Sequence, residues 1–218
     1  MRDILIIVSD MNPSFVYLAS QSPRRAELLA QLGVAHQLLL ADETEDAESL
    51  ELVRGAEAPA TYVQRVTKLK LGAAIERAKH RNLWTSADAS PILCADTTVA
   101  MGRSIFGKPD GIRAAGQMLE ALSGKTHRVL TSVGMAWCSG TRVKTSFALS
   151  ESRVTFAKLS KVQIESYIAT GESFGKAGSY GVQGKAAAFI ASISGSYSGI
   201  MGLPLHETAV LLKMAKFL

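Results

Sequence analysis

The chain has 218 residues, of which 47% are hydrophobic and 20% are charged, and this balance excludes a disordered polypeptide. Its 24 Lys and Arg residues against 19 Asp and Glu residues give a net charge of +5, which suits an anionic ligand without requiring one. Two cysteines, Cys94 and Cys138, are too few for a disulfide scaffold, and no run of about 18 apolar residues predicts a membrane span. We therefore expect a soluble, cytoplasmic protein.

The first half of the chain alternates patterns typical of strands and helices. Residues 1–14 contain an apolar run between Asp3 and Asp10 and no small-residue cleavage site, so we expect an N-terminal extension or an added strand. Ser22-Pro23 is typical of a helix N-cap followed by proline in the first turn. The expected elements are a strand over 15–19, a helix from 23 that ends at Gly33, a strand over 36–40, an acidic surface loop over 42–51 and a long helix that begins at Pro59.

The second half predicts further strands and helices and a long hairpin that turns near Ser139-Gly140. The expected elements are a strand over 92–95, a helix over 112–122, hairpin strands over 129–137 and 143–156, a helix over 161–170, a glycine-rich loop over 171–184, a strand over 189–193 and a helix after Pro204. This order predicts an α/β fold in which helices flank a mixed, twisted sheet.

The segment Ser20-Gln-Ser-Pro-Arg-Arg25 joins the first strand to the first helix. Arg24 and Arg25 fall in the first helical turn, where the macrodipole already places about half a positive charge. That arrangement costs a few tenths to about 1 kcal/mol unless an anion is present. A phosphate would meet the backbone N–H groups, the hydroxyls of Ser20 and Ser22 and both guanidinium groups. The alternative is a capped helix with two solvated arginines.

A carboxylate, Asp96, follows the apolar strand expected over 92–95. At the carboxyl end of a strand in an open α/β sheet it would face the ligand crevice, where it suits a general base or a metal ligand. Asp is also a common turn residue at strand ends. The hydroxyl of the next residue, Thr97, can bind a ligand or its own backbone.

Two lysines and one glutamine complete the candidate residues. Lys70 falls on the apolar stripe of its helix, so its ammonium either extends outward or reaches an anion in a cleft. Lys108 lies in the turn Gly107-Lys-Pro109 and can point inward or into solvent. Gln183, in the glycine-rich loop, offers a donor and an acceptor that match the edge of a nucleobase, although a mobile loop with a solvated glutamine has the same sequence.

Several classes of protein find no support. The sequence contains no Walker-type phosphate loop, no dinucleotide-binding glycine motif after a strand and no Cys/His cluster at zinc spacing. Its four histidines are scattered and no serine elbow accompanies them. Aromatic residues make up 6% and do not alternate with a basic stripe, so we do not expect nucleic acid as a partner.

Six segments occur together in one order from about Tyr17 to the C-terminus. They are Leu18-Ala-Ser-Gln-Ser-Pro-Arg-Arg-Ala-Glu-Leu-Leu29, Ala95-Asp-Thr-Thr-Val99, Gly107-Lys-Pro109, Met118-Leu-Glu-Ala-Leu-Ser-Gly-Lys-Thr-His127, Lys176-Ala-Gly-Ser-Tyr-Gly-Val-Gln-Gly184 and Gly195-Ser-Tyr-Ser-Gly-Ile-Met-Gly-Leu-Pro-Leu205. In this combination the chain resembles the Maf family of septum formation protein homologues, which are nucleoside triphosphate pyrophosphatases. The paired arginines and Val182-Gln-Gly184 resemble the branch that acts on dTTP and UTP, in contrast to the branch that prefers 7-methyl-GTP.

The resemblance implies two lobes around a central cleft, formed within residues 15–218, and a homodimer. It also implies cleavage of a nucleoside triphosphate between the α- and β-phosphates, with Mg²⁺ or Mn²⁺, to a monophosphate and pyrophosphate. The catalytic residues expected are Asp96, as proton acceptor, with Lys70 and Lys108. The expected substrate-binding residues are Ser20, Ser22, Arg24, Arg25, Thr97 and Gln183, of which Thr97, Gln183 and Arg24 fall where the family reads specificity.

The metal site is the part of the resemblance with most departures. Family members carry an acidic pair after the second strand, and an ungapped comparison puts Glu45 at its second position, so Glu45 and Asp96 are the expected metal ligands. Glu43 takes that place if the loop is shifted by two residues. The loop over 46–59 is longer than usual, and Gly175 stands where many members have Asp.

Two functions from different classes remain open. The first is a pyrophosphatase that hydrolyses dTTP, UTP or modified pyrimidine nucleotides. The second is a regulator of cell division or septum formation that binds a nucleotide or nucleic acid in the same cleft without turnover. The sequence does not decide between sanitation of the nucleotide pool and control of division.

Overall fold

The computed structural model describes residues 14–42, 45–46, 49–84 and 89–218. The helices are α1 (Pro23–Gln31), α2 (Pro59–His80), α3 (Ile112–Leu122), α4 (Lys161–Ala169), α5 (Tyr197–Met201) and α6 (Leu205–Met214), with 3-10 turns at Ser49–Glu51, Ala177–Ser179 and Lys185–Phe189. The strands are β1 (Val16–Leu18), β2 (His36–Leu38), β3 (Ile92–Met101), β4 (Ser104–Phe106), β5 (Thr126–Ser139), β6 (Arg142–Phe156) and β7 (Ile190–Ser194). None of the helices in these ranges is long and apolar enough to cross a membrane.

One mixed sheet of seven strands forms the centre of the molecule, and the order of the predicted elements indicates such a sheet. Its order is β2-β1-β3-β5-β6-β7, and β4 pairs with β3 outside this path. β1 runs parallel to β2 and β3, whereas the long strands β3, β5 and β6 are antiparallel. The predicted α/β class with a mixed sheet flanked by helices is therefore confirmed.

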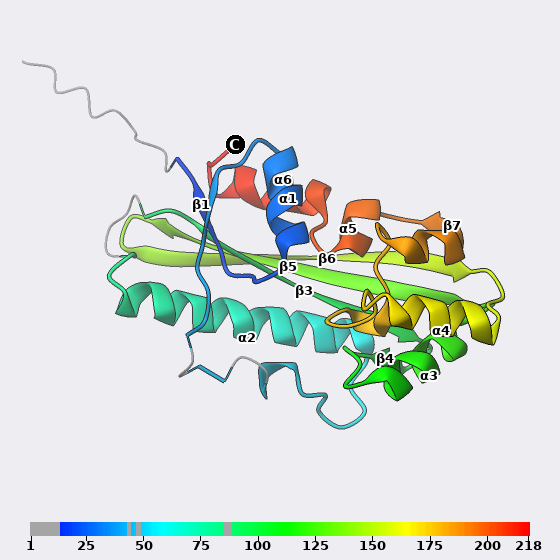
Figure 1. Cartoon of the computed structure of the whole chain (residues 1–218). Helices are drawn as coiled ribbons and strands as arrows, with labels where there is room; N and C mark the ends of the chain where they lie inside the picture. The colour runs from blue at the N-terminus through cyan, green and yellow to red at the C-terminus, as the bar shows by residue number, and fades with distance from the viewer. Residues whose placement is uncertain (1–13, 43–44, 47–48, 85–88) are drawn as a thin grey trace, which may run out of the picture.

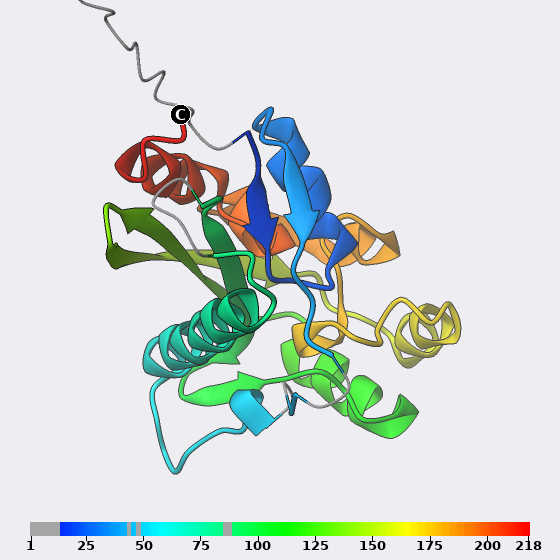
Figure 2. The same cartoon turned by 90° about the vertical axis from the view of Figure 1, so that its left-hand side faces the viewer.

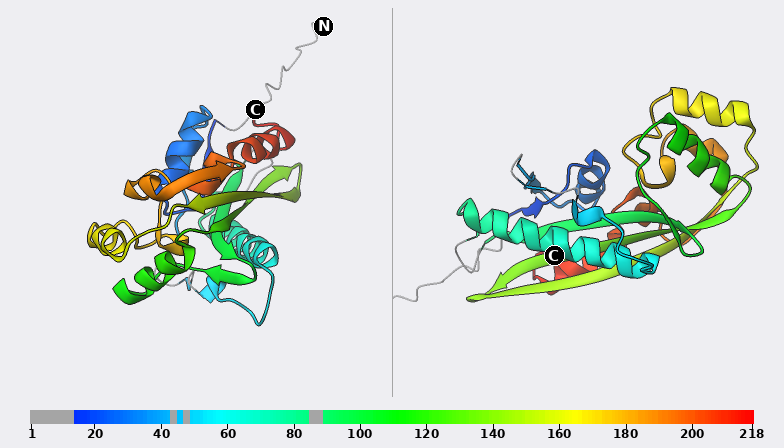
Figure 3. Two further views of the ribbon diagram at one scale, coloured as in Figure 1. Left: turned by 90° about the vertical axis from the view of Figure 1, so that its right-hand side faces the viewer. Right: turned by 90° about the horizontal axis from the view of Figure 1, so that it is seen from below.

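Helices cover both faces of this sheet. Figure 1 shows α2 along one face and α1, α5 and α6 on the other, and the view in Figure 2 separates the same two layers. α3 and α4 pack together at one end of the long strands, which is plain in the view from below in Figure 3. Buried clusters fill each interface, with Leu28 and Leu211 under α1 and α6, Leu71 and Ala74 under α2, and Leu119 under α3.

β3 differs from its prediction in a way that matters for function. The strand was expected to end before Asp96, but it continues to Met101 because the residues that follow, Thr97 to Val99, are β-branched and pair in register with β5. The expectation that Asp96 follows the end of a strand is therefore wrong. β4 and α5 are further elements that the sequence patterns did not predict.

One edge of β3 is open where Asp96 lies. β1 pairs with β3 as far as Leu93, and β4 pairs with it from Val99 onward. Within the described ranges no strand pairs with this edge between those two residues. The opening replaces the strand-end crevice that the sequence suggested, and it brings the middle of a buried strand to the surface of a cleft.

The expected extension over 1–14 lies outside the described residues except for Ser14. The same holds for Glu43, the alternative metal ligand. For neither of them does the structure add to the sequence prediction.

Candidate active site

A cleft of about 820 Å³ opens along this edge of β3, within the range of small-molecule sites. Its walls come from the start of α1, the 3-10 turn Ser49–Glu51, α2, β3 and the glycine-rich loop. All ten residues that the sequence selected line it, namely Ser20, Ser22, Arg24, Arg25, Glu45, Lys70, Asp96, Thr97, Lys108 and Gln183. The structure thus brings together residues from six separate segments, while their chemical roles stay predictions.

Asp96 and Thr97 face opposite sides of the sheet because successive side chains of a strand alternate. Asp96 contacts Lys70 on α2, and Thr97 contacts Arg25 on α1. Since the edge of β3 away from β5 is unpaired here, both sides open into the same cleft. A ligand in the cleft can therefore meet a carboxylate on one side of the strand and a hydroxyl on the other.

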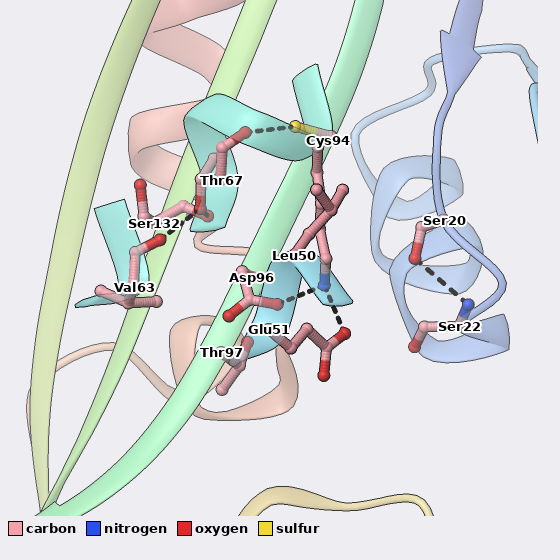
Figure 4. Close-up of polar contacts among 12 residues, drawn as sticks. Ser20, Ser22, Leu50, Glu51, Val63, Thr67, Cys94, Asp96, Thr97 and Ser132 are labelled. Atoms are coloured by element: carbon pink, nitrogen blue, oxygen red, sulfur yellow. Dashed lines mark hydrogen bonds and ion pairs between the residues drawn. The ribbon is translucent and has the colours of Figure 1, made fainter. Parts of the chain in front are cut away.

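Lys70 is held between two carboxylates. Its Nζ donates to Oδ1 of Asp96 at 2.6 Å and to Oε1 of Glu51 at 2.7 Å, the two dashed contacts that Figure 4 draws to these labelled residues. Burial lowers the pKa of Lys70, but attraction to Asp96 and Glu51 outweighs burial and leaves the pKa above its ordinary value. The ammonium is therefore charged, which fits the sequence alternative in which Lys70 reaches into a cleft.

Glu51 is a site residue that the sequence analysis missed. Its carboxylate also accepts from Nζ of Lys108, at 2.9 and 3.1 Å, so one side chain joins both predicted catalytic lysines. Burial raises the pKa of Glu51, and the charges and hydrogen bonds of Lys70 and Lys108 more than reverse that effect. The expected acidic surface loop thus ends in the cleft, and among its six acids nothing in the sequence distinguishes Glu51.

The backbone around Glu51 is anchored by the start of α2. Tyr62 Oη donates to the carbonyl of Glu51 at 2.8 Å, and Arg65 donates to the carbonyls of Leu50 and Leu52. Glu57 in turn binds the guanidinium of Arg65. These bonds fix the backbone from which the Glu51 side chain extends into the cleft.

The two arginines of the first motif have different environments. Arg25 donates to the carbonyl of Gly202 at 2.7 Å, to Oγ of Ser20 at 3.1 Å and to Oγ1 of Thr97 at 3.3 Å, so its guanidinium ties α1 to β3 and to the end of α5. Burial lowers the pKa of Arg25. The Arg24 side chain makes no hydrogen bond within the described part of the chain, and the residue lines the cleft. The Arg24 guanidinium therefore has all five N–H donors left for a ligand, whereas Arg25 has two.

The start of α1 has the predicted form, with Ser22 as N-cap and Pro23 in the first turn. The Ser22 side chain makes no capping hydrogen bond, and the Ser22 N–H instead donates to Oγ of Ser20 at 3.2 Å, a contact visible in Figure 4. No acidic residue lies in the first turn. This helix end keeps its partial positive charge facing the cleft.

Glu45 lies in the cleft but is paired. Both of its carboxylate oxygens accept from Arg77 at 2.6 Å, and these hydrogen bonds hold the pKa of Glu45 below its ordinary value. Arg77 also donates to the carbonyl of Leu39 at 2.8 Å. For Glu45 to hold a metal, it would have to exchange this bidentate partner.

The glycine-rich loop supplies another wall of the cleft. Gln183 is exposed and lines the cleft. Lys176, which the sequence analysis quoted in a motif without assigning it a role, donates to the carbonyl of Glu172, and burial together with nearby Arg24 lowers its pKa. Its position in that motif was a signal that Lys176 belongs to the site. The residue type alone did not predict that its side chain would line the cleft.

Sequence comparison shows the family to which the chain belongs. Residues 15–215 match the family described as Maf-like protein, and the chain therefore belongs to the Maf-like protein family. A protein of Albidiferax ferrireducens named dTTP/UTP pyrophosphatase is 60% identical over 203 residues, which cover 93% of this chain and 98% of that one. Proteins of the same name from a Polaromonas species and from Cupriavidus metallidurans are 60% and 58% identical over 92% and 93% of this chain, and over 96% and 97% of their own lengths.

Proposed function

We propose that the chain hydrolyses dTTP, UTP or modified pyrimidine nucleoside triphosphates between the α- and β-phosphates, releasing a monophosphate and pyrophosphate. The observation that carries this proposal is the arrangement of charge in the cleft, where Asp96 lies 2.6 Å from Lys70 among the further cations Arg24 and Lys108. The substrate preference comes from the relatives, which are named dTTP/UTP pyrophosphatase and are up to 60% identical.

A triphosphate carries about four negative charges, and its hydrolysis depends mainly on holding the phosphates, neutralising their charge and aligning a water. Arg24, Lys70 and Lys108 supply cations, and the half-buried start of α1 supplies the hydroxyl of Ser22 and the backbone N–H of Arg24. Asp96 orients the attacking water and accepts its proton. Arg25 uses three of its five N–H donors to hold Ser20, Thr97 and Gly202 in place and keeps two for the substrate.

The residues present also suit a divalent metal, Mg²⁺ or Mn²⁺. Asp96 uses Oδ1 for Lys70, and its Oδ2 accepts no hydrogen bond within the described residues, so one carboxylate oxygen is available, either for the attacking water or for the ion. No group of three or more His, Cys, Asp or Glu side chains in the described ranges is arranged to hold an ion. A site that offers only one or two carboxylates fits Mg²⁺, which typically takes one or two carboxylates together with substrate phosphates and water. When bound, such an ion would neutralise phosphate charge, and Glu45 is its second ligand if it leaves Arg77.

We further propose that residues 15–218 act as one unit of two lobes with the cleft between them, as a cytoplasmic homodimer. The cleft supports the first part, since residues of α1, α2 and the glycine-rich loop, far apart in the sequence, all line it. Cytoplasmic location and the dimer rest on the sequence and on the family resemblance.

The test is a panel of canonical and modified nucleoside triphosphates, offered to the purified protein with Mg²⁺ or Mn²⁺, with every product identified. Pyrophosphate and a monophosphate from dTTP and UTP, at higher kcat/KM than from CTP or 7-methyl-GTP, support the proposal. Binding without any product would overturn it and favour the regulator without turnover.

A further inference from the structure

A chain of three hydroxyl and guanidinium groups fixes the hydrogen atoms around Thr97. Thr131, on β5, lies opposite Thr97 in the sheet, and their Oγ1 atoms are 2.9 Å apart. Thr131 is fully buried, whereas Thr97 is half-buried and lines the cleft. Neither the sequence motifs nor the proposed function assign any role to Thr131.

The direction of each hydrogen bond in this chain follows from chemistry. Thr131 Oγ1 lies 2.7 Å from the carbonyl oxygen of Gly199, which can only accept, so Thr131 spends its single hydroxyl proton there. Thr131 can then only accept from Thr97, and the Thr97 hydroxyl proton must point at Thr131. On the other side, Arg25 can only donate, and it donates to Oγ1 of Thr97 at 3.3 Å.

Thr97 therefore reaches the cleft with one lone pair and no proton. A hydroxyl oxygen has one hydrogen and two acceptor sites, and the hydrogen and one acceptor site are already occupied by Thr131 and Arg25. A phosphate oxygen, itself an acceptor, finds no partner in such a group. The part of a nucleotide that contacts Thr97 must instead be a donor on its base or sugar.

We propose that Thr131 is a positioning residue that makes Thr97 an obligate acceptor, and that this acceptor selects the imide N3–H of thymine and uracil. Thymine and uracil both carry a donor at N3, where cytosine carries an acceptor, so an acceptor-only Thr97 pairs with the first two and opposes the third. This inference rests on the proposed function and adds the physical basis of its base preference.

The polarity of Thr97 depends on Thr131 in a way that mutation can reverse. In Thr131→Val the acceptor for the Thr97 proton is gone, so the Thr97 hydroxyl can turn its proton to the cleft and donate to N3 of cytosine. We expect the ratio of kcat/KM for UTP to that for CTP to fall by about tenfold, the effect of one neutral hydrogen bond. Thr131→Ser keeps the hydroxyl and should keep the ratio.

A matched control separates selectivity from damage to packing. Thr67 is also a fully buried threonine; its Oγ1 donates to the carbonyl of Val63 at 2.8 Å and lies 3.3 Å from the carbonyl of Ser132, and it makes no hydrogen bond to Thr97 or Thr131. Thr67→Val makes the same chemical change and should lower stability without changing the ratio of UTP to CTP. A Thr131→Val protein that loses UTP and CTP activity by one common factor, as Thr67→Val would, overturns the proposal and is the result expected if Thr97 contacts a sugar hydroxyl.

A second test uses the wild-type protein and does not depend on whether a variant folds. 3-Methyl-UTP retains the sugar and phosphates of UTP but lacks N3–H, so we expect a kcat/KM at least about tenfold below that of UTP. Equal turnover of the two would overturn the assignment of Thr97. If wild-type protein forms no pyrophosphate from UTP or dTTP, the proposed function fails instead, and titration calorimetry with UTP and 3-methyl-UTP then decides the Thr97 contact by the same tenfold difference in Kd.

Discussion

Replacing Glu51 by glutamine removes the carboxylate that Lys70 and Lys108 share in the cleft. A triphosphate must bind the same two ammonium groups, so in the wild-type protein it competes with Glu51. Neutralising Glu51 should therefore lower the KM for dTTP and UTP. The amide oxygen of glutamine still accepts a hydrogen bond, so we expect the fold to persist.

The size of this effect follows from how exposed each pair is. The Lys108 side chain is 55% exposed, so its pairing with Glu51 contributes only a few tenths of a kcal/mol. The Lys70 and Glu51 side chains are 21% and 28% exposed, and their pairing reaches the upper end of the surface range, about 1 kcal/mol. Together these predict a KM about tenfold lower in Glu51→Gln, with kcat within about twofold of wild type.

The assay is steady-state pyrophosphate release with dTTP and Mg²⁺ at fixed ionic strength, because salt screens the exposed pair. Glu76→Gln is the matched control: it removes a carboxylate that pairs with Lys79 on α2, at an exposed position outside the cleft lining. That variant should keep the wild-type KM. A Glu51→Gln protein with raised KM, or with kcat reduced by tenfold or more, would refute the competition and make Glu51 part of the catalytic machinery.

Three further predictions concern substitutions at individual residues. Asp96→Asn should lower kcat by at least about 100-fold while nucleotide Kd, measured by calorimetry, stays within a few-fold, and a matching loss of binding would contradict the role of Asp96. Burial lowers the pKa of His127 to about 4, so the folded state holds it neutral while the unfolded state binds a proton below about pH 6.5. Stability should therefore fall by about 2 kcal/mol between pH 7 and pH 5 in urea unfolding, and His127→Gln should lose that component of the slope. Gly178 has φ +67° and Gly33 has φ +70°, so an alanine at either position should cost about 1 kcal/mol in backbone strain. An added Cβ at Gly178 would also lie 2.9 Å from Val99, whereas at Gly33 no atom lies within 4 Å, so Gly178→Ala should cost about 2–4 kcal/mol in total; equal losses in thermal unfolding would contradict the clash.

The sequence predicted most of the fold because its helices and long strands carry strong local signals. α3 has the predicted bounds, Ile112–Leu122, since its apolar stripe and the Ser123-Gly124 stop agree. β3 was predicted too short because Asp96 looks like a turn residue, and only pairing with β5 carries the strand through it. β4 has three residues, too few for a pattern to reveal.

The residues of the candidate site also fall into those that the sequence could predict and those that it could not. Residues in dense motifs, such as Arg24 and Asp96, could be selected from sequence, and all of those selected line one cleft. Glu51 could not, because its inward orientation depends on Tyr62 and Arg65 holding a turn in an acidic loop. The polarity of Thr97 is a property of a three-dimensional hydrogen-bond chain and leaves no trace in the motif.

The central claim concerns which bond of the nucleotide breaks. The most direct measurement is a ³¹P NMR time course of dTTP with Mg²⁺ and the purified protein. The account predicts that the three triphosphate resonances give way to those of pyrophosphate and dTMP, and that Asp96→Asn leaves the spectrum of dTTP unchanged over the same period. Orthophosphate with dTDP, or an unaltered dTTP spectrum with the wild-type protein, would contradict it.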